Sequence, residues 1–375
     1  MGELTADRNT VLVLGAYGLA GREVVRGLIE RTKLAVIASG RNERKLATVA
    51  APLDAARLQA RVFDATEPAA LTRACEEAAL VINCVGPYTE HGAEIAGRVI
   101  RAGRGYVDFA NEQSHYKRLQ GLDAEARTQH VPLVTAAGAI PGVSTVLAGL
   151  AAKRLPGLHS VELLYAQGRM PDNDAGLASL LSAILESGLG SVTLRDGRHV
   201  PLRLGEARRT EDLPAPFGAT SMIGFPTADE LIVPQKVALR CVTTYWAMGD
   251  VPPGFFSLIR LLKPHARPWA YKLVRRLMEW SMQHDYARAV KKGIGPEAVL
   301  KVVGHGPDKR WEALAFFRDG GVATAFLPVL VARRFGAGAE IGAGLLSPLD
   351  VFDPDDVVRE MVDGNWASSF REGTT

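Results

Sequence analysis

Short apolar runs alternate with amphipathic stretches through the first 135 residues of the chain. The run from Val11 to Leu14 is typical of a strand buried on both faces. Apolar residues then recur at helical spacing between Arg22 and Arg31, and Leu34 to Ser39 forms the next strand-like run. The alternation predicts these further elements: a strand ending near Val62-Phe63, a helix from Glu67, a strand from Leu80 to Cys84, a helix from Ala93 to Ala102, a strand from Tyr106 to Phe109, a helix from His115 to Thr128 and a strand from Pro132 to Thr135. This order predicts an α/β fold with a Rossmann-type doubly wound parallel sheet.

The pattern changes near Leu158, where strand-like segments with turn residues between some of them mix with helical stretches such as Ala175 to Glu186. Asp196-Gly197 is a hairpin signal. This region predicts an inserted α+β domain built on a mostly antiparallel sheet. Two helical stretches, 320–335 and the one near Asp353, are expected to return to the first domain. The predicted domains are 1–152, 153–321 and a C-terminal helical part, 322–375.

Three glycines follow the first strand at an even spacing of three, in VLVLGAYGLAGREVV. A strand that turns sharply into a helix can bring a pyrophosphate against bare backbone at the helix N-terminus. An ordinary tight turn is the alternative interpretation. The predicted cofactor-binding residues of this loop are Gly15, Ala16, Tyr17, Gly18, Leu19, Ala20 and Gly21.

The end of the second strand indicates which dinucleotide is bound. Arg41 lies twenty residues beyond Gly21, and no acid occurs between Val36 and Asn42. An acid at this position usually binds the ribose hydroxyls of NAD, whereas an arginine can bind the 2′-phosphate of NADP. We therefore expect NADP, with Ser39, Arg41 and Asn42 near the adenosine half. The alternative is a solvated arginine that opens the next helix.

Two later loops belong to the same predicted site. Asp64 is expected either to lie near the adenine or to cap the following helix. The loop Cys84, Val85, Gly86 and Pro87 follows the fourth strand and is expected near the nicotinamide, because the carboxyl ends of parallel strands face the ligand.

Candidate catalytic groups follow directly. Tyr88 is expected to project from the loop as a polar partner at the reacting centre, and the alternative is an aromatic side chain that only packs. His91 could donate a proton near neutral pH, and the alternative is a residue that only begins a helix. Asp108, Asn111 and Glu112 follow the fifth strand and are expected on the same ligand-facing edge. Glu112 could orient a ribose or a substrate amine, although acids also stabilise helix starts. In the second domain, four residues could contact the substrate or could simply be polar surface or hairpin residues: Tyr165, Gln167, Arg169 and His305.

Composition narrows the class of protein. The chain has 375 residues, 47% hydrophobic and 23% charged, which is typical of a globular protein. Its three cysteines are scattered and its eight histidines show no ligand spacing, so no metal is predicted. The apolar run 133–152 is broken by Pro141-Gly142, which argues against a transmembrane helix. Residues 1–10 do not resemble a signal peptide, so a cytoplasmic location is expected.

The segment 260–292 is basic, with nine Lys and Arg against two acids, in a chain whose net charge is +3. Leu273, Leu277 and Trp280 form an apolar helical stripe beside Lys272, Arg275 and Arg276. A core-packing helix with a solvated face is the favoured interpretation. A membrane-surface helix and a docking face for an acyl carrier are the alternatives. Because the basic residues form one local face and not a general basic surface, nucleic acid is not expected as a partner. A homodimer is compatible with the sequence.

Several motifs together resemble the saccharopine dehydrogenase-like oxidoreductases, which include trans-acting enoyl reductases and carboxynorspermidine dehydrogenases. They are the glycine loop, SGRN at 39–42, NCVGPY at 83–88, YVDFANE at 106–112, GAIPGV at 138–143 and GGVATAFLPVLVARRF at 320–335. The resemblance implies NADP(H)-dependent hydride transfer. Imine-reducing members commonly carry an acid before the Pro-Gly pair and Asp-His after it, whereas this chain has Ile140 there and Ser144-Thr145 after Val143.

The combined evidence predicts an NADP(H)-dependent reductase of a C=N or C=C bond in a small or acyl-type substrate. A non-catalytic NADP(H) sensor that controls a partner is the alternative.

Overall fold

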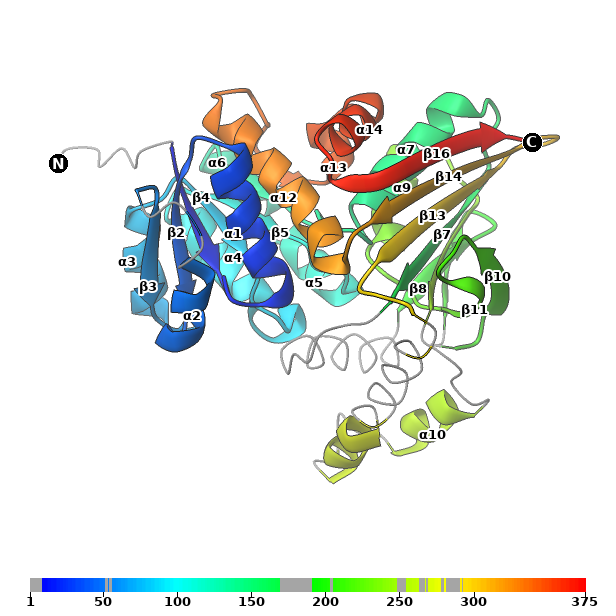
Figure 1. Cartoon of the computed structure of the whole chain (residues 1–375), viewed down its shortest axis with the longest axis horizontal. Helices are drawn as coiled ribbons and strands as arrows, with labels where there is room; N and C mark the ends of the chain where they lie inside the picture. Colours follow the sequence, from blue (N-terminus) through cyan, green and yellow to red (C-terminus); the bar gives the residue numbers. More distant parts are fainter. Residues whose placement is uncertain are drawn as a thin grey trace. The chain divides into compact units, whose positions relative to one another are not determined.

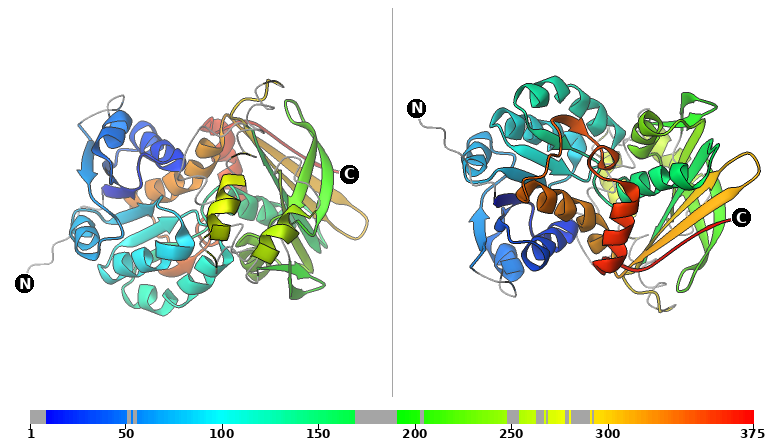
Figure 2. Two further views of the ribbon diagram at one scale, coloured as in Figure 1. Left: turned by 90° about the horizontal axis from the view of Figure 1, so that it is seen from below. Right: turned by 90° about the horizontal axis from the view of Figure 1, so that it is seen from above.

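The computed structural model divides into two compact units (Figures 1 and 2). Unit 1 comprises residues 1–146 and 321–366, and unit 2 comprises residues 147–320 and 367–375. The residues that the structure describes are 9–375 except 51–52, 54–55, 169–190, 203–204, 248–253, 263–266, 268, 278–279, 281–290 and 292.

Unit 1 contains a seven-stranded parallel sheet in the order β15-β6-β5-β4-β1-β2-β3. Its strands are β1 (Thr10–Leu14), β2 (Ala35–Gly40), β3 (Leu58–Val62), β4 (Leu80–Asn83), β5 (Gly105–Asp108), β6 (Pro132–Val134) and β15 (Gly344–Leu346). The chain runs outward from β1 to β3 and then returns to β4 on the other side of β1. The strand order therefore reverses between β1 and β4, where doubly wound sheets bind their ligands. The predicted Rossmann-type fold is confirmed.

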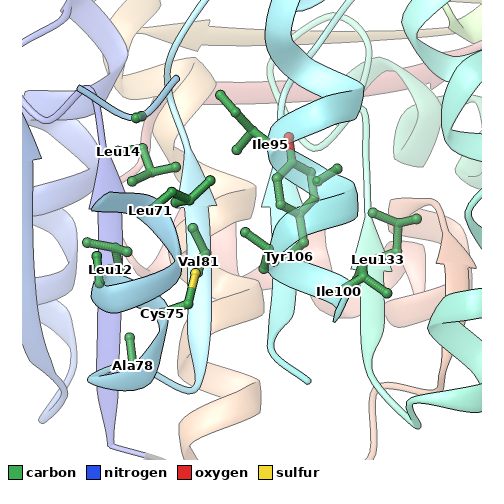
Figure 3. Packing of buried hydrophobic residues seen from close by; sticks show 14 of the residues in the cluster. Leu12, Leu14, Leu71, Cys75, Ala78, Val81, Ile95, Ile100, Tyr106 and Leu133 are labelled. Atoms are coloured by element: carbon green, nitrogen blue, oxygen red, sulfur yellow. The ribbon is translucent and has the colours of Figure 1, made fainter. Parts of the chain in front are cut away.

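Helices cover both faces of this sheet. They are α1 (Leu19–Arg31), α2 (Glu43–Ala50), α3 (Pro68–Glu76), the π-helix η1 (Tyr88–Gly92), α4 (Ala93–Arg101), α5 (Gln113–Gln120), α6 (Asp123–Thr128), α12 (Gly320–Gly336), α13 (Pro348–Val351) and α14 (Pro354–Asp363). On one face, Leu71, Cys75 and Ala78 of the α3 region pack on Leu12 of β1 and Val81 of β4 (Figure 3). Residues one turn apart thus place one face of the helix on the sheet, as the apolar spacing requires.

Polar side chains end several of these elements earlier than predicted. The fourth strand stops at Asn83 and not at Cys84, because the Asn83 side chain accepts a hydrogen bond from the Val85 N–H at 2.9 Å. The fifth strand stops at Asp108, whose carboxylate accepts from the Ala110 N–H at 3.2 Å. The single helix predicted from His115 to Thr128 is wrong, since α5 and α6 are separate helices and α5 ends with Gly121 as its C-cap.

Unit 2 contains a nine-stranded sheet in the order β10-β11-β12-β7-β13-β14-β16, with β8 paired to β12 and β9 to β8. The strands are β7 (Ser160–Gln167), β8 (Val192–Arg195), β9 (Arg198–Pro201), β10 (Arg208–Leu213), β11 (Gly218–Gly224), β12 (Cys241–Ala247), β13 (Ala298–His305), β14 (Arg310–Phe317) and β16 (Ala367–Thr374). Among the described strands of this sheet, only the β12–β7 pair is parallel, so the prediction of a mostly antiparallel sheet is confirmed. Asp196 and Gly197 adopt positive φ in the β8–β9 hairpin, as a two-residue hairpin turn requires.

Three helices of unit 2 are α7 (Val143–Arg154), which crosses from unit 1, α9 (Asp229–Lys236) and α10 (Phe255–Leu262). The predicted helix from Ala175 to Glu186 lies outside the described residues. The C-terminus differs from the prediction of helices to residue 375, because the chain leaves α14 and continues as β16, paired with β14. In the described part of the chain, no helix has both the length and the apolar character needed to span a bilayer.

Candidate functional site

The three glycines occupy the turn between β1 and α1, at the carboxyl edge of the sheet. Gly15 has a φ of +73°, which a residue with a side chain rarely adopts, and a Cβ there would lie 2.9 Å from the Cys84 carbonyl oxygen. A Cβ at Gly21 would lie 2.2 Å from the Gly15 carbonyl oxygen. Glycine at these two positions therefore lets α1 begin directly against the loop.

Gly18 differs from the other two glycines. It is the N-cap of α1, its φ is −67°, and a Cβ there would meet only the Gly15 carbonyl oxygen, at 3.3 Å. The first turn of a helix leaves N–H groups without intrahelical partners, and Gly18 has no side chain to satisfy them. The first turn of α1 also contains no acid. Backbone donors and the positive end of the helix dipole thus border open space beside Gly18, which suits a phosphate group.

The other loop residues have backbone roles. Ala16 is buried and donates its N–H to the Ser39 carbonyl oxygen at 2.9 Å, which joins the loop to the end of β2. Leu19 and Ala20 lie in the first turn of α1. Ser39 is buried, and its hydroxyl donates to the Val13 carbonyl oxygen at 3.0 Å. The Ser39 side chain therefore joins β2 to β1, and only its backbone lies at the predicted ligand edge.

The ring of Tyr17 lies against the end of β2. A Cβ at Gly40 would lie 2.3 Å from the Tyr17 ring, so only glycine leaves room for it. The Lys45 ammonium lies 6.0 Å from the centre of the same ring. Asn42 caps the start of α2, since its side chain accepts from the Lys45 N–H at 3.0 Å. A tyrosine and a lysine thus flank the position where the adenosine half is expected.

Arg41 and Asp64 meet beside this position, with Arg41 Nη1 3.5 Å from Asp64 Oδ2. The Arg41 side chain is exposed, which leaves most of its donors for another anion. Burial by itself raises the pKa of Asp64, but hydrogen bonds from the backbone and side chain of Thr66 and the charge of Arg41 lower it below its usual range. The capping role considered for Asp64 is wrong, because the N-cap of α3 is Glu67.

The loop after β4 lies beside Gly15. Cys84 donates its N–H to the Leu14 carbonyl oxygen at 2.9 Å, and burial raises the pKa of its thiol. Val85 is held by Asn83, and the Gly86–Pro87 peptide bond is cis. The predicted nicotinamide loop is thus attached to both β1 and β4.

Tyr88 begins η1 and is buried, with its hydroxyl donating to the Asn83 carbonyl oxygen at 2.7 Å. The expectation that its phenol projects from the loop is therefore wrong. Burial, followed by the charge of Asp108, raises the pKa of the phenol well above its usual value. His91 lies in the same π-helix and is partly exposed, with Nε2 3.6 Å from Glu90 Oε2. Single-turn π-helices are frequent at functional sites. The catalytic roles of both residues stay predictions.

A buried polar cluster lies beneath η1, and the pairing of its side chains was not predicted from the sequence. His115 and Asp108 are both fully buried and bonded to each other, and the same carboxylate accepts from the Thr135 hydroxyl at 2.6 Å. Asn83 donates to the Tyr106 hydroxyl at 2.9 Å. The sequence placed Asp108 at the ligand-facing edge, whereas the burial of His115 against it was not predicted.

The remaining predicted residues fall in several places. Glu112 is the buried N-cap residue of α5 and accepts from the Asn111 N–H at 3.1 Å. In unit 2, the Tyr165 hydroxyl donates to Gln167 at 3.0 Å, and His305 lies 3.3 Å from Glu162. Arg169 lies outside the described residues. Within the described ranges, no group of three or more His, Cys, Asp and Glu side chains is arranged to hold a metal ion.

Comparisons with known proteins agree with this geometry. Residues 11–134 match the family model of the saccharopine dehydrogenase NADP binding domain. A trans-acting enoyl reductase of Mycobacterium ulcerans is 33% identical over 112 residues, which cover 29% of this chain and 27% of that protein. A lipid droplet localized protein of Caenorhabditis elegans is 29% identical over 142 residues, covering 35% of this chain and 33% of that protein. The matches thus span about a third or less of these relatives.

The fold of the whole chain is similar to that of a solved structure. Apo saccharopine dehydrogenase (L-Glu forming) from Saccharomyces cerevisiae superposes with a TM-score of 0.65 at 14% identity, covering 98% of this chain and 100% of that one. The chain therefore has a fold similar to that of this enzyme.

Proposed function

We propose that the chain, whose residues 11–134 are a saccharopine dehydrogenase NADP binding domain, is an NADP(H)-dependent oxidoreductase that transfers hydride to a C=N or C=C bond of a small or acyl-type substrate. The observation that carries the proposal is the bare backbone at Gly18, the N-cap of α1, where a Cβ would meet only the Gly15 carbonyl oxygen and no side chain caps the first-turn N–H groups. Bound NADPH would supply the hydride, and the protein must supply orientation, exclusion of water and a proton.

The residues of unit 1 fit NADPH. Gly18 and the first turn of α1 would hold the pyrophosphate, and Arg41, with Lys45 nearby, would hold the 2′-phosphate. Asp64 keeps Arg41 at the end of β2 without burying it. The loop after β4 would border the nicotinamide, and its attachment through Asn83 keeps that border fixed.

The proton has one candidate donor in this part of the chain. The Tyr88 hydroxyl is buried and donates to a backbone carbonyl, so we assign Tyr88 to the shape of the loop. His91 is partly exposed on the same π-helix, and an imidazole can exchange a proton near neutral pH. We therefore propose His91 as the group that protonates the atom next to the carbon that receives the hydride.

Unit 2 supports an apolar or acyl-type substrate. Trp246 stacks on Phe225 with ring centres 4.7 Å apart and lies 5.5 Å from Tyr165. The indole N–H of Trp246 is buried and has no hydrogen-bond partner among the described residues. Buried donors are usually satisfied, and a substrate carbonyl would satisfy this one. One relative is named as an enoyl reductase, and the protein with the similar fold is a dehydrogenase. The test therefore includes substrates with a C=C bond and substrates with a C=N bond.

The test is NADPH oxidation by the purified full chain against a panel of cyclic imines and a panel of enoyl thioesters. We expect turnover with one panel, and turnover that falls when Trp246 is replaced by Phe through a higher KM. Tight NADPH binding without turnover on either panel would instead support a sensor that uses the dinucleotide to control a partner. Absence of NADPH binding would reject both functions.

A further inference from the structure

Exposed hydrophobic side chains are concentrated in one short part of unit 2. Among the described residues, eight large hydrophobic side chains are exposed, and six of them fall within 258–280. They are Leu258, Leu261, Trp269, Tyr271, Leu273 and Trp280. We call these six residues the exposed apolar patch. The other two, Val62 and Val362, lie in unit 1. Clustered exposed apolar side chains mark interaction surfaces, whereas single ones need no explanation.

In the helical residues 269–277, some apolar side chains pack inside the protein and others are exposed. Ala270 and Val274, one turn apart, are buried. Trp269 and Leu273 are 56% and 41% exposed, and Trp280 is 65% exposed. At 3.6 residues per turn, positions 269 and 273 share one stripe, beside the arc that contains the two buried residues. The favoured interpretation of a core-packing helix therefore explains Ala270 and Val274 but does not explain the exposure of Trp269 and Leu273.

Basic side chains flank this stripe on its other side. Helical spacing places Lys272, Arg275 and Arg276 on the arc opposite the buried residues, next to Trp269 and Leu273. The segment 260–292 carries a net charge of +7, whereas the rest of the chain is negative, since the total is +3. Among the described residues, Lys272, Arg275 and Arg276 therefore place cationic charge beside the exposed Trp269 and Leu273. This coincidence indicates a partner that is both anionic and apolar.

We propose that the exposed apolar patch docks unit 2 on the surface of an anionic phospholipid membrane. An interfacial helix has a hydrophobic stripe that enters the acyl boundary and cationic residues that pair with lipid phosphates. The indoles of Trp269 and Trp280 are suited to this boundary, because tryptophan has an apolar body and a polar N–H and concentrates at membrane interfaces. Leu258 and Leu261 of α10 are exposed one turn apart and add a second apolar element.

The test uses the full chain and sedimentation with vesicles of phosphatidylcholine alone or of phosphatidylcholine with phosphatidylserine. No dinucleotide is added, so the outcome is independent of the proposed enzyme activity. We expect binding to the vesicles that contain phosphatidylserine, little binding to phosphatidylcholine alone, and at least a tenfold loss of affinity when the salt is raised from about 0.1 M to 1 M, because the Debye length falls from about 10 to 3 Å. Tryptophan fluorescence should shift to shorter wavelength on binding.

Two double variants separate the contributions. The change W269S/W280S removes the apolar contact, and K272E/R276E reverses the flanking charge, so each should weaken vesicle binding at least tenfold. The matched controls are V62S, an exposed apolar residue of unit 1, and K33E/K117E, two exposed lysines of unit 1, and both should bind as the parent does. Thermal unfolding verifies that each variant is folded.

Several outcomes would overturn the proposal. They are no binding to either vesicle, equal binding to both compositions, or full binding by both patch variants. Self-association without vesicle binding that disappears in W269S/W280S would assign the patch to a second copy of the chain.

Discussion

Asp108 and His115 form a fully buried pair in unit 1, with His115 Nε2 2.7 Å from Asp108 Oδ2. The other carboxylate oxygen accepts from the Thr135 hydroxyl and from the N–H of Ala136. Burial by itself raises the pKa of Asp108, but His115 and these hydrogen bonds lower it below its usual range. One carboxylate thus joins the ends of β5 and β6 to α5, below the π-helix that carries Tyr88 and His91.

The change D108N should destabilise the protein. An amide has one acceptor oxygen, so an NH₂ group would face either His115 Nε2 or the backbone N–H of Ala136, with no water to replace the lost acceptor. Removing one partner of a buried charged group costs about 3 to 5 kcal/mol. Urea unfolding measures the loss. The control is D356N, which removes an exposed pair with Arg359 and should cost less than about 1 kcal/mol. Equal unfolding midpoints for the two variants would contradict the role of Asp108.

Substitutions at Gly18 and Gly21 should differ in their effects on cofactor binding and on stability. A Cβ at Gly18 would meet only the Gly15 carbonyl oxygen and the φ is ordinary, so G18V should remain folded while its side chain occupies the proposed phosphate position. We expect G18V to lose both NADPH and NADH binding in calorimetry. Alanine at Gly21 would place Cβ 2.2 Å from the Gly15 carbonyl oxygen, so G21A should lose stability as well as binding. Normal NADPH affinity in G18V would show that the phosphates bind elsewhere.

Arg41 should determine the preference for NADPH over NADH. In R41D the guanidinium that would pair with the 2′-phosphate is replaced by a repelling carboxylate, while NADH has no phosphate there. Hydrogen bonds to charged groups contribute about 1.5 to 3 kcal/mol, so NADPH affinity should fall roughly ten- to hundredfold, with little change for NADH. The variant D64N keeps the arginine and should keep the preference. An unchanged ratio of the two affinities in R41D would mean that Arg41 does not contact the 2′-phosphate.

The local part of the fold could be predicted from the sequence, because its signals are local. The run from Val11 to Leu14 and the glycines after it specify a buried strand, a turn and a helix without any distant contact. The same holds for the Asp196-Gly197 turn, where two residues determine the hairpin.

The parts that were missed depend on tertiary contacts. The strand β16 has few apolar residues and forms because β14 offers a free edge in unit 2. The inward orientation of Tyr88 depends on the Asn83 carbonyl, and the burial of His115 depends on Asp108. The exposure of Trp269 was likewise not predictable. The helical pattern identifies an apolar stripe, but it does not show which residues of the stripe are covered by the rest of the protein.

Glu230 should give the stability of unit 2 an unusual dependence on pH. Its side chain is fully buried at the start of α9, where its two oxygens accept from the N–H groups of Thr227 and Thr244. The pKa of Glu230 is raised from 4.5 to about 8, chiefly by burial and also by the neighbouring carboxylate of Asp229, with the backbone hydrogen bond from Thr227 acting in the opposite direction. The folded protein therefore keeps a proton that the unfolded chain releases above pH 4.5.

The sign of the effect follows from proton binding. Between pH 4.5 and about 8 the folded state binds more protons at this site than the unfolded state, so the free energy of unfolding falls as the pH rises, and it levels off above pH 8. One proton gives a slope of at most about 1.4 kcal/mol per pH unit. The carboxylates with lowered pKa, such as Asp64 and Asp108, act in the opposite direction and at lower pH, near or below their ordinary pKa of 3.8.

Urea unfolding of the parent and of E230Q across this pH range measures the contribution of Glu230. The glutamine cannot titrate, and its NH₂ group faces a backbone N–H, so E230Q should be less stable than the parent near the acidic end of the range. The difference between their free energies of unfolding should shrink as the pH rises. The parent loses the stability that the Glu230 proton supplies, whereas the variant has no proton to lose at this position. The control is E43Q, an exposed glutamate at the start of α2, which should follow the parent at every pH. Parallel pH profiles for E230Q and the parent would mean that Glu230 already carries its charge in the folded protein.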